Sequence, residues 1–356
     1  MHSLFCAWLN DDPFRITEIR ISANEFPVIR GKMVPARREE QSQECISIGR
    51  YGDRKPTEGK PEADMNTIAL ELVPPNLDGG VQMAVAEGRK VTELSRASGL
   101  AGHIKHVMIP GIIQEDGDRP VGFREKMDTI DFWRTIEPEL GGMRGLCTQV
   151  TAFHDEQELT ERLQNLRDAG MDGIAFVGVP RNMADGEGPG VAPTDALAKF
   201  QDVVPHRGSI LIPTRHGEQG RFGFKCERGA TYGMTQLLYS DAIVRFLAEF
   251  ARTTPHRPEI LLSFGFIPGV ESRKKLIQWL IQDPGNPAVA GEQEFVAQTA
   301  ELGFEQRKQR VVDLYKRVID GVHGLGFPLS VHLEAPYGYN KPAFETFATM
   351  LDHWAP

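Results

Sequence analysis

The feature that most constrains the fold of this chain is a regular alternation, from residue 67 onward, between short apolar runs and amphipathic helical stretches. Apolar, β-branched runs of this length are typical of buried strands, and a helix between two strands allows them to run parallel. The expected strands cover residues 67–75, 104–110, 145–151, 173–179, 209–214, 232–239, 260–268 and 329–334. Eight strands that alternate with helices within residues 65–356 predict a (β/α)8 TIM barrel.

The stretches between these strands are expected to form helices or loops, and the first of them argues against a competing fold. The expected helices cover residues 81–98, 131–134, 155–169, a stretch capped near 194, a short turn at 225–228, 241–252, stretches that begin at 272 and 287, 305–325 and 342–354. Residues 111–124 and 215–223 are expected to be polar loops. An open doubly wound sheet would carry G-x-G-x-x-G after its first strand, but Val-Pro-Pro-Asn stands there at 73–76. The barrel is therefore the favoured architecture.

The beginning of the chain has a different character. Residues 37–64 are polar and rich in glycine, proline and both charges, with too little apolar surface to offset the entropy lost on ordering. We expect residues 1–64 to be a flexible N-terminal extension and residues 65–356 to be the barrel domain. Met65 lies two residues before the first strand, which suggests the hypothesis that the functional protein begins there.

Composition narrows the class of partner. The net charge of -9 argues against nucleic acid or an anionic membrane as the main partner. No apolar run approaches the roughly 20 residues that span a bilayer, and the first residues make a poor secretory signal. The four cysteines are scattered without zinc-ligand spacing, as expected of reduced thiols. These features predict a cytoplasmic protein that acts on a small molecule, with its oligomeric state left open.

Glu71 is an acid inside the first apolar strand. Alternation along the strand places Ala69, Glu71 and Val73 on one face and Ile68, Leu70 and Leu72 on the other, so the carboxyl group has buried neighbours. A buried carboxylate is costly unless it is paired, and otherwise it holds its proton to unusually high pH. This behaviour suits a general acid. The alternative is a structural ion pair with a buried Arg or Lys.

Polar residues near the ends of three strands extend this hypothesis. In a barrel the C-terminal strand ends meet at one mouth, where the chemistry of this fold is placed. Because the eighth strand neighbours the first, Glu334 is expected to face Glu71, and their repulsion would raise the apparent pKa of the pair. The alternative for each residue is a buried structural role. The candidate residues at the strand ends are Gln149, Thr151, Thr235, Gln236, Tyr239, His332 and Glu334.

Two polar loops are candidate anion sites. Glycines expose backbone N–H groups, and a following helix N-terminus favours negative charge, so either loop could hold a pyrophosphate or a substrate carboxylate. Ordinary solvated loops are the alternative. No motif indicates a bound metal, so none is expected. The candidate residues are Arg181, Asn182, Gly186 and Gly188 in the first loop and Arg215, Arg221 and Lys225 in the second.

Three motifs taken together resemble the methylenetetrahydrofolate reductase family. They are Leu-Glu-Leu-Val-Pro-Pro at 70–75, the stretch 229–239 with its Thr-Gln pair, and Gly-Phe-Ile-Pro at 265–268, followed by His332 on the last strand. The resemblance extends over most of residues 65–354. It implies a (β/α)8 barrel of one-carbon metabolism and methionine biosynthesis that reduces 5,10-methylenetetrahydrofolate to 5-methyltetrahydrofolate. Glu71 would be the acid that helps open the methylene bridge, and Gln236 would lie at the folate.

Two departures from the family bear on the cofactor. Flavin-dependent members carry Arg-Gly-Asp and then Pro at the end of the fourth strand, where this chain has Val-Gly-Val-Pro at 177–180. Leu72 and Val73 replace an aromatic pair after the first-strand acid. The chain looks closer to the short, flavin-free mycobacterial reductases, which implies direct hydride transfer from NADH, with NADPH as an open variant and FAD absent. The alternatives are an FAD-dependent reductase and a folate-binding or methyl-transferring barrel without reductase activity.

Overall fold

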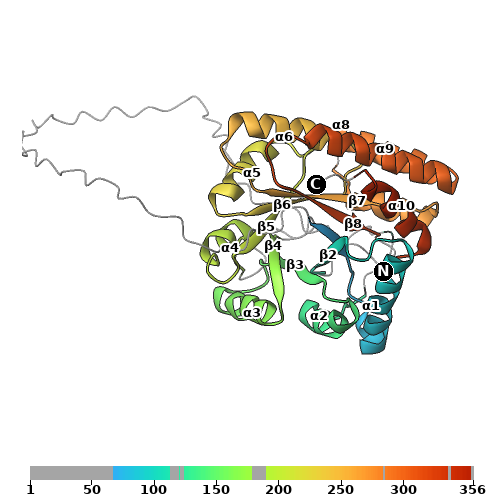
Figure 1. Cartoon of the computed structure of the whole chain (residues 1–356). Coiled ribbons are helices and arrows are strands. Elements are labelled where there is room, and N and C mark those ends of the chain that lie inside the picture. Colours follow the sequence, from blue (N-terminus) through green and yellow to red (C-terminus); the bar gives the residue numbers. More distant parts are fainter. Residues whose placement is uncertain are drawn as a thin grey trace, which may run out of the picture. The chain divides into compact units, whose positions relative to one another are not determined.

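Eight parallel strands close into a barrel in the computed structural model, which describes residues 67–112, 120, 124–178, 190–283, 285–335 and 338–353. The strands follow one another around the barrel in chain order, and β8 pairs with β1 (Figure 1). The strands are β1 Ile68–Glu71, β2 Ile104–Ile109, β3 Arg144–Val150, β4 Met171–Val177, β5 His206–Leu211, β6 Tyr232–Thr235, β7 Glu259–Gly265 and β8 Leu329–Glu334. This topology confirms the predicted (β/α)8 TIM barrel.

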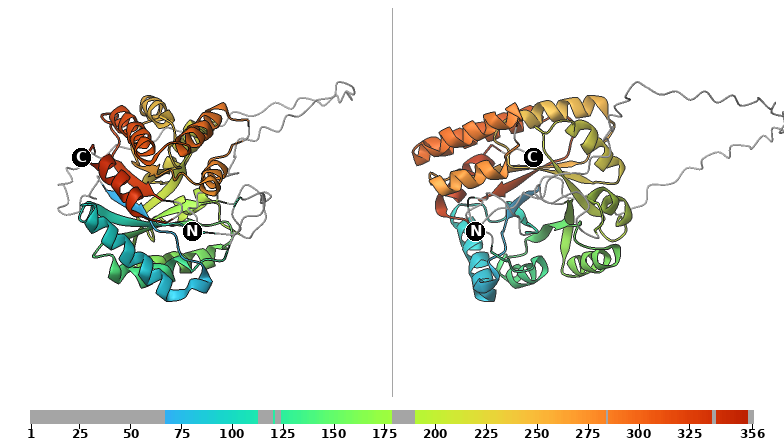
Figure 2. Two further views of the ribbon diagram at one scale, coloured as in Figure 1. Left: turned by 90° about the vertical axis from the view of Figure 1, so that its right-hand side faces the viewer. Right: turned by 180° about the vertical axis from the view of Figure 1, so that it is seen from behind.

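The helices lie outside the strands and surround them (Figures 1 and 2). They are α1 Gly80–Ala97, α2 Thr129–Ile136, α3 Glu156–Asp168, α4 Pro193–Lys199, α5 Glu218–Glu227, α6 Ala242–Thr253, α7 Glu271–Leu280, α8 Pro287–Ala300, α9 Phe304–Val322 and α10 Lys341–Leu351. Short 3-10 turns, η1 Leu77–Gly79 and η2 Glu137–Glu139, precede α1 and follow α2. No helix in the described residues is long and apolar enough to cross a bilayer.

Local sequence signals set several helix ends. Asp155 and Glu158 form a reciprocal capping box at the start of α3, which satisfies two backbone donors that the first turn leaves open. Asn340 accepts a hydrogen bond from the backbone N–H of Ala343 and so caps α10. After α3, Gly170 adopts a φ of 90°, which a residue with a side chain rarely tolerates. These ends lie within a few residues of those predicted.

The barrel has two apolar layers because side chains alternate across each strand. One layer fills the interior and includes Ala69, Met108, Ala175, Met234 and Leu261. The other lies between the strands and the helices, where Ile68, Leu70 and Leu72 of the first strand region belong. The side chain of Glu71 therefore shares the inward direction of Ala69, as the alternation along β1 predicted.

One stretch expected to be a loop is partly helical. The prediction of a polar loop at 215–223 was wrong from Glu218 onward, where α5 begins. Phe222 is buried on this helix, and its ring lies 5.1 Å from that of Phe250 on α6. The two glycines of the stretch, Gly220 and Gly223, suggest a loop by propensity, but burial of the Phe222 ring outweighs that preference. The expected extension of the sixth strand to Tyr239 also fails, since β6 ends at Thr235.

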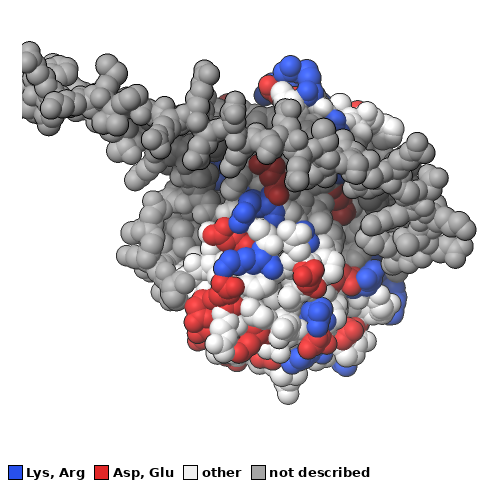
Figure 3. All heavy atoms as spheres, turned by 90° about the vertical axis from the view of Figure 1, so that its left-hand side faces the viewer, with Lys and Arg blue, Asp and Glu red and all other residues white. Residues whose placement is uncertain are grey.

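Charges on the surface are mixed rather than segregated. On the face drawn in Figure 3, Lys and Arg side chains are interspersed with Asp and Glu side chains. Arg228 and Asp195, for example, form an ion pair of 2.8 Å. The described part of this face thus offers no broad basic patch of the kind that binds a nucleic acid backbone.

The barrel interior leads to a prediction about Gly208 in β5. A Cβ atom built at Gly208 would lie 2.2 Å from ring atoms of the buried Tyr232, so we expect Gly208→Ala to lower the free energy of unfolding by about 1–3 kcal/mol. Gly220→Ala, at an exposed position of α5, is the matched control, because a Cβ there meets nothing within 4 Å and alanine favours helix. Urea unfolding of both variants measures the difference; equal stability of the two would contradict this packing.

Candidate functional site

A column of polar side chains lines one wall of the barrel. Along β8 the buried residues Ser330, His332 and Glu334 alternate with Val331 and Leu333, which belong to the outer apolar layer. On the neighbouring strand β7, Ser263 lies beside His332, and its Oγ atom is 3.0 Å from the Nδ1 atom of that ring. Lower in the same wall, the Ser330 hydroxyl donates a hydrogen bond to Glu259. The inner apolar layer fills much of the remaining interior.

Glu71 joins the upper end of this column. Ala69 pairs with His332 in the sheet, so Glu71 at the end of β1 comes beside Glu334 at the end of β8. One carboxyl oxygen each of Glu71 and Glu334 and one ring nitrogen of His332 all lie within 4.8 Å of one another. Their exposed fractions are only 2%, 0% and 0%. The approach of Glu334 to Glu71 expected from barrel closure is therefore present.

The imidazole of His332 is neutral at physiological pH. Burial lowers the pKa of His332 from 6.5 to about 4, although the nearby charge of Glu71 acts in the opposite direction. Its Nδ1 atom lies 3.2 Å from Oε1 of Glu334, which would be an ion pair only with a protonated ring. We treat the contact as a close approach of a neutral ring rather than an ion pair, because complete burial disfavours the imidazolium. With hydrogen on Nδ1 the ring donates toward Glu334; without it, Nδ1 accepts from Ser263.

A neutral histidine leaves the two carboxyl groups without the charge of an imidazolium between them. Two carboxylates this close in a buried site repel each other, which disfavours the ionisation of both. A carboxyl group that keeps its proton is what a general acid requires before it reacts. Glu71 and Glu334 thus form a buried pair of carboxyl groups at the C-terminal end of the barrel.

Tyr339 is a part of this site that sequence reasoning missed. Its hydroxyl donates hydrogen bonds to the backbone carbonyl oxygen of Glu71 and, at 3.2 Å, to that of Leu333. Burial, with the charges of Glu71 and Glu334 acting in the same direction, raises the pKa of Tyr339 well above its ordinary value, so the phenol remains a donor. Tyr339 therefore ties the ends of β1 and β8 together. An aromatic residue just before the Asn340 cap was the available signal.

Ser263 was also missed. It is a hydroxyl residue within the apolar run of β7, it is completely buried, and it contacts His332. A lone polar residue in such a run is the same signal that drew attention to Glu71.

The predicted residues of the sixth strand region lie close to the mouth, and their side chains are buried against other parts of the protein. Gln236 is 7% exposed, and its Nε2 atom donates a 2.8 Å hydrogen bond to the carbonyl oxygen of Leu280. Thr235 accepts a hydrogen bond of 2.8 Å from the backbone N–H of Ser263, and it alternates with Met234, which faces the interior. Tyr239 is 3% exposed. The structure thus places these three side chains at the edge of the barrel beside β7.

Gln149 is not brought together with the acidic pair. It lies between Thr148 and Val150 on β3, and Val150 belongs to the inner layer, so Gln149 faces outward. Its Oε1 atom accepts a hydrogen bond of 2.6 Å from Nε of Arg162 on α3, and its Nε2 atom donates to the carbonyl oxygen of Val150. The register of β3 turns Gln149 toward the helix layer, which argues against its predicted contact with substrate. Thr151, one residue beyond the strand, is completely buried and makes its backbone hydrogen bond to Val177.

The second candidate anion loop surrounds a buried acid. Arg215 lies 3.9 Å and Lys225 lies 3.6 Å from carboxylate oxygens of Glu218, which is 2% exposed. Lys225 also donates to the carbonyl oxygen of Ile210 at the end of β5. These contacts hold the cations near the mouth. The other predicted anion residues, Arg181, Asn182, Gly186 and Gly188, lie outside the described residues, as do residues 1–64 of the predicted extension.

The three donors of Glu71, His332 and Glu334 also form a candidate metal ligand set. Two carboxylates and an imidazole suit divalent first-row transition metals. The sequence showed no such cluster, because its members come from two strands at opposite ends of the barrel sequence. Such a metal would compete with the proton for the same oxygen atoms, so the two roles of the cluster are exclusive.

The comparisons with known proteins decide the family. A family model described as mycobacterial methylenetetrahydrofolate reductase matches residues 64–356. This chain belongs to that family. The match covers every described element of the barrel, and membership supports an oxidoreductase that acts on a folate. No protein with a curated function matches the sequence.

Two solved structures are similar to this chain to different degrees. One is a protein from Clostridium thermocellum that binds two copies of 5-methyl-5,6,7,8-tetrahydrofolic acid; it has 17% identity and a TM-score of 0.57, over 81% of this chain and 94% of the other. Oxaloacetate acetylhydrolase in complex with 3,3-difluorooxalacetate has 9% identity and a TM-score of 0.40, over 81% and 78% of the two chains, and this likeness is too weak to inform function. The first likeness is one of fold.

The burial of His332 leads to a prediction about its titration. Because burial lowers the pKa of His332 to about 4, its ring nitrogen signals should not shift between pH 5.5 and 8 in a ¹⁵N NMR titration. A His332→Gln variant assigns the signals. A pKa below its unfolded value of 6.5 also means that this group's contribution to stability is complete above pH 6.5 and is lost as the pH falls toward 4. Titration of the ring near pH 6.5 would contradict the neutral assignment.

Proposed function

We propose that this protein reduces 5,10-methylenetetrahydrofolate to 5-methyltetrahydrofolate with a hydride taken directly from NADH, and that Glu71 is the general acid. The observation that carries the proposal is the buried pair of Glu71 and Glu334 at the C-terminal mouth of the barrel, in a chain of the methylenetetrahydrofolate reductase family. Family membership supports the reaction, and the position of the pair supports the role of the acid.

The reaction needs one proton and one hydride at two different atoms of the folate. Protonation at N10 allows the bond between N10 and the methylene carbon to break, with its electron pair remaining on N10. The carbon is left as an iminium to N5, and the hydride adds to it to form the methyl group. The nicotinamide supplies this hydride when bound and leaves as the oxidised form. The balance is complete with no further reductant.

The residues of the site fit the proton step. Glu71 delivers the proton, and Glu334 keeps it available because the two carboxylates resist simultaneous ionisation. His332 stays neutral and, with Ser263, orients Glu334. Tyr339 holds the backbone of Glu71 in place through its hydrogen bond to the carbonyl oxygen. A dry environment strengthens the attraction between the resulting Glu71 carboxylate and the cationic iminium.

The remaining candidates divide between the two ligands. Gln236 and Tyr239 lie along one edge of the mouth and suit contact with the folate, whereas Thr235 faces away from the interior and is bonded to Ser263. Arg215, whose loop follows β5, and the predicted residues Arg181, Asn182, Gly186 and Gly188 suit the dinucleotide phosphates. We leave Gln149 out of this set because of its outward direction. The replacement of aromatic residues by Leu72 and Val73 supports a site without FAD.

Substitution of the acid tests the mechanism. Glu71→Gln is nearly isosteric and should keep the fold and folate binding, but it should lower kcat at least about 100-fold because the amide cannot donate the required proton. Steady-state NADH oxidation that depends on methylenetetrahydrofolate measures this. Glu93→Gln, at an exposed site on α1, is the matched control and should turn over normally. Near-normal turnover of Glu71→Gln would remove this residue from the mechanism.

The cofactor needs its own test. An anaerobic assay of purified protein with NADH or NADPH, with and without FAD, should show turnover without added FAD and no flavin absorption after denaturation. Treatment with EDTA should leave the rate unchanged, because the acidic pair carries a proton rather than a metal. A yellow protein whose activity follows its flavin content would overturn the flavin-free proposal, and loss of activity on chelation, restored by a divalent metal, would overturn the proton assignment.

A further inference from the structure

Helices α7 and α8 hold the segment 236–240, which connects β6 to α6. Its first residue, Gln236, donates to the carbonyl oxygen of Leu280, the last residue of α7. Near its other end, the ring of Tyr239 lies 6.4 Å from that of Phe295 on α8. The two residues of the segment that are proposed to contact the folate, Gln236 and Tyr239, are therefore held by contacts with α7 and α8.

Glu292 supplies a polar contact between this segment and α8. The carboxyl group is 5% exposed, and its Oε1 atom accepts a hydrogen bond of 2.6 Å from the hydroxyl of Ser240. Ser240 directly follows Tyr239, and its Oγ atom also accepts from the backbone N–H of Ala242 at the start of α6, at 3.4 Å. Through Ser240, the buried carboxyl group of Glu292 is thus linked both to the segment and to the start of α6.

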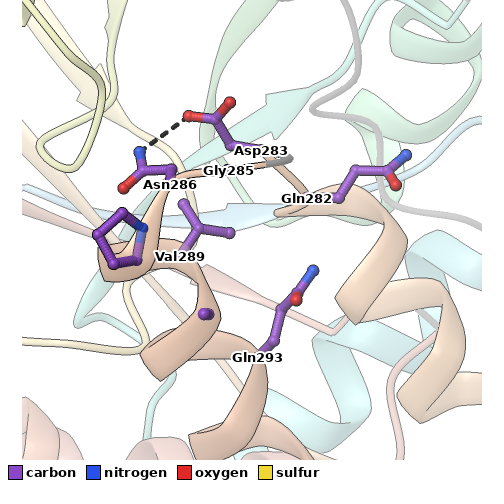
Figure 4. Close-up of a pocket in the computed structure, with 8 residues that line it drawn as sticks. Gln282, Asp283, Gly285, Asn286, Val289 and Gln293 are labelled. Carbon is purple, nitrogen blue, oxygen red and sulfur yellow. Dashed lines mark hydrogen bonds between the residues drawn. The ribbon is translucent and has the colours of Figure 1, made fainter.

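The two helices form a firm support for this contact. Gln278 on α7 and Gln293 on α8 each donate their side-chain amide to the backbone carbonyl of the other, at 3.3 and 3.2 Å. Asn286, which caps α8, donates to the carbonyl oxygen of Thr214 in the loop after β5. The α7 to α8 connection borders a cavity of about 420 Å³, and Figure 4 shows the bond between Asn286 and Asp283 there. Glu292 therefore lies on a pair of packed helices that is also bonded to the loop after β5 at the mouth.

A carboxyl group in this position works against stability. Burial raises the pKa of Glu292 to about 7, with the Ser240 hydrogen bond acting in the opposite direction. A buried acid that ionises near neutral pH destabilises the fold relative to an uncharged isostere. Residues that lower stability in this way concentrate at functional sites.

We infer that Glu292 is a positioning residue, which holds the segment 236–240 through Ser240 in the shape that lets Gln236 and Tyr239 contact the folate. This inference rests on the proposed function. Glu292 itself touches neither ligand; it acts through the backbone of the segment. Its loss should therefore weaken folate binding and leave the proton and hydride steps intact.

Three variants test the inference. Glu292→Ala and Ser240→Ala each remove one partner of the hydrogen bond, and each should raise KM for methylenetetrahydrofolate about tenfold with kcat within about twofold of wild type. Glu292→Gln keeps an oxygen that accepts from Ser240, so it should restore a KM near the wild-type value. It should also melt at or above the wild-type temperature at pH 8, because the amide carries no buried charge.

Hydrogen exchange reads the same contact without turnover. Peptides that cover residues 236–241 should exchange faster in Glu292→Ala and Ser240→Ala than in wild type, and at the wild-type rate in Glu292→Gln. Glu294→Gln, on the exposed face of α8, is the control and should change neither readout. Failure of the proposed function would appear as no folate turnover in the wild-type protein. Failure of this inference would appear as a wild-type KM in Glu292→Ala, or as a loss of kcat alone.

Discussion

The burial of two carboxyl groups beside each other inside a closed barrel is the constraint on which the site depends. A soluble protein avoids this arrangement unless a partner or a shared proton makes it tolerable. The described contacts around the two acids include a buried imidazole, a serine hydroxyl bonded to that ring and a tyrosine that binds the backbone of Glu71. In our proposal the pair holds one proton, and that proton is what the reaction consumes.

The fold provides this environment through strand closure. Pairing of β8 with β1 brings residues 71 and 334 to one edge, and the polar column of β8 continues below them toward Ser330 and Glu259. Apolar side chains fill much of the rest of the interior, and the two acids are buried beside them. Around the mouth, Tyr339 binds the ends of β1 and β8, and α7 and α8 contact the segment after β6, so the protein supports both the proposed proton donor and the proposed substrate-binding edge.

The sequence predicted the architecture because the period of its apolar runs is a property of the chain alone. The inward direction of Glu71 and its approach to Glu334 followed from alternation and closure, which need no knowledge of packing. The outward direction of Gln149 could not be predicted, because a one-residue difference in register reverses the direction of every side chain on a strand, and β3 is buried on both faces. The helix from Glu218 and the roles of Tyr339 and Glu292 depend on contacts between distant segments, which no local pattern reports.

The fate of one hydrogen atom tests the central claim most directly. Protein free of flavin is given methylenetetrahydrofolate and NADH that carries deuterium at the transferred position, in ordinary water, and the product is examined by mass spectrometry. Direct transfer, with only the proton drawn from the acidic pair and solvent, predicts that the deuterium appears in the methyl group of 5-methyltetrahydrofolate. A methyl group that contains solvent hydrogen in its place would show that an exchanging carrier stands between the two ligands, and it would contradict the account.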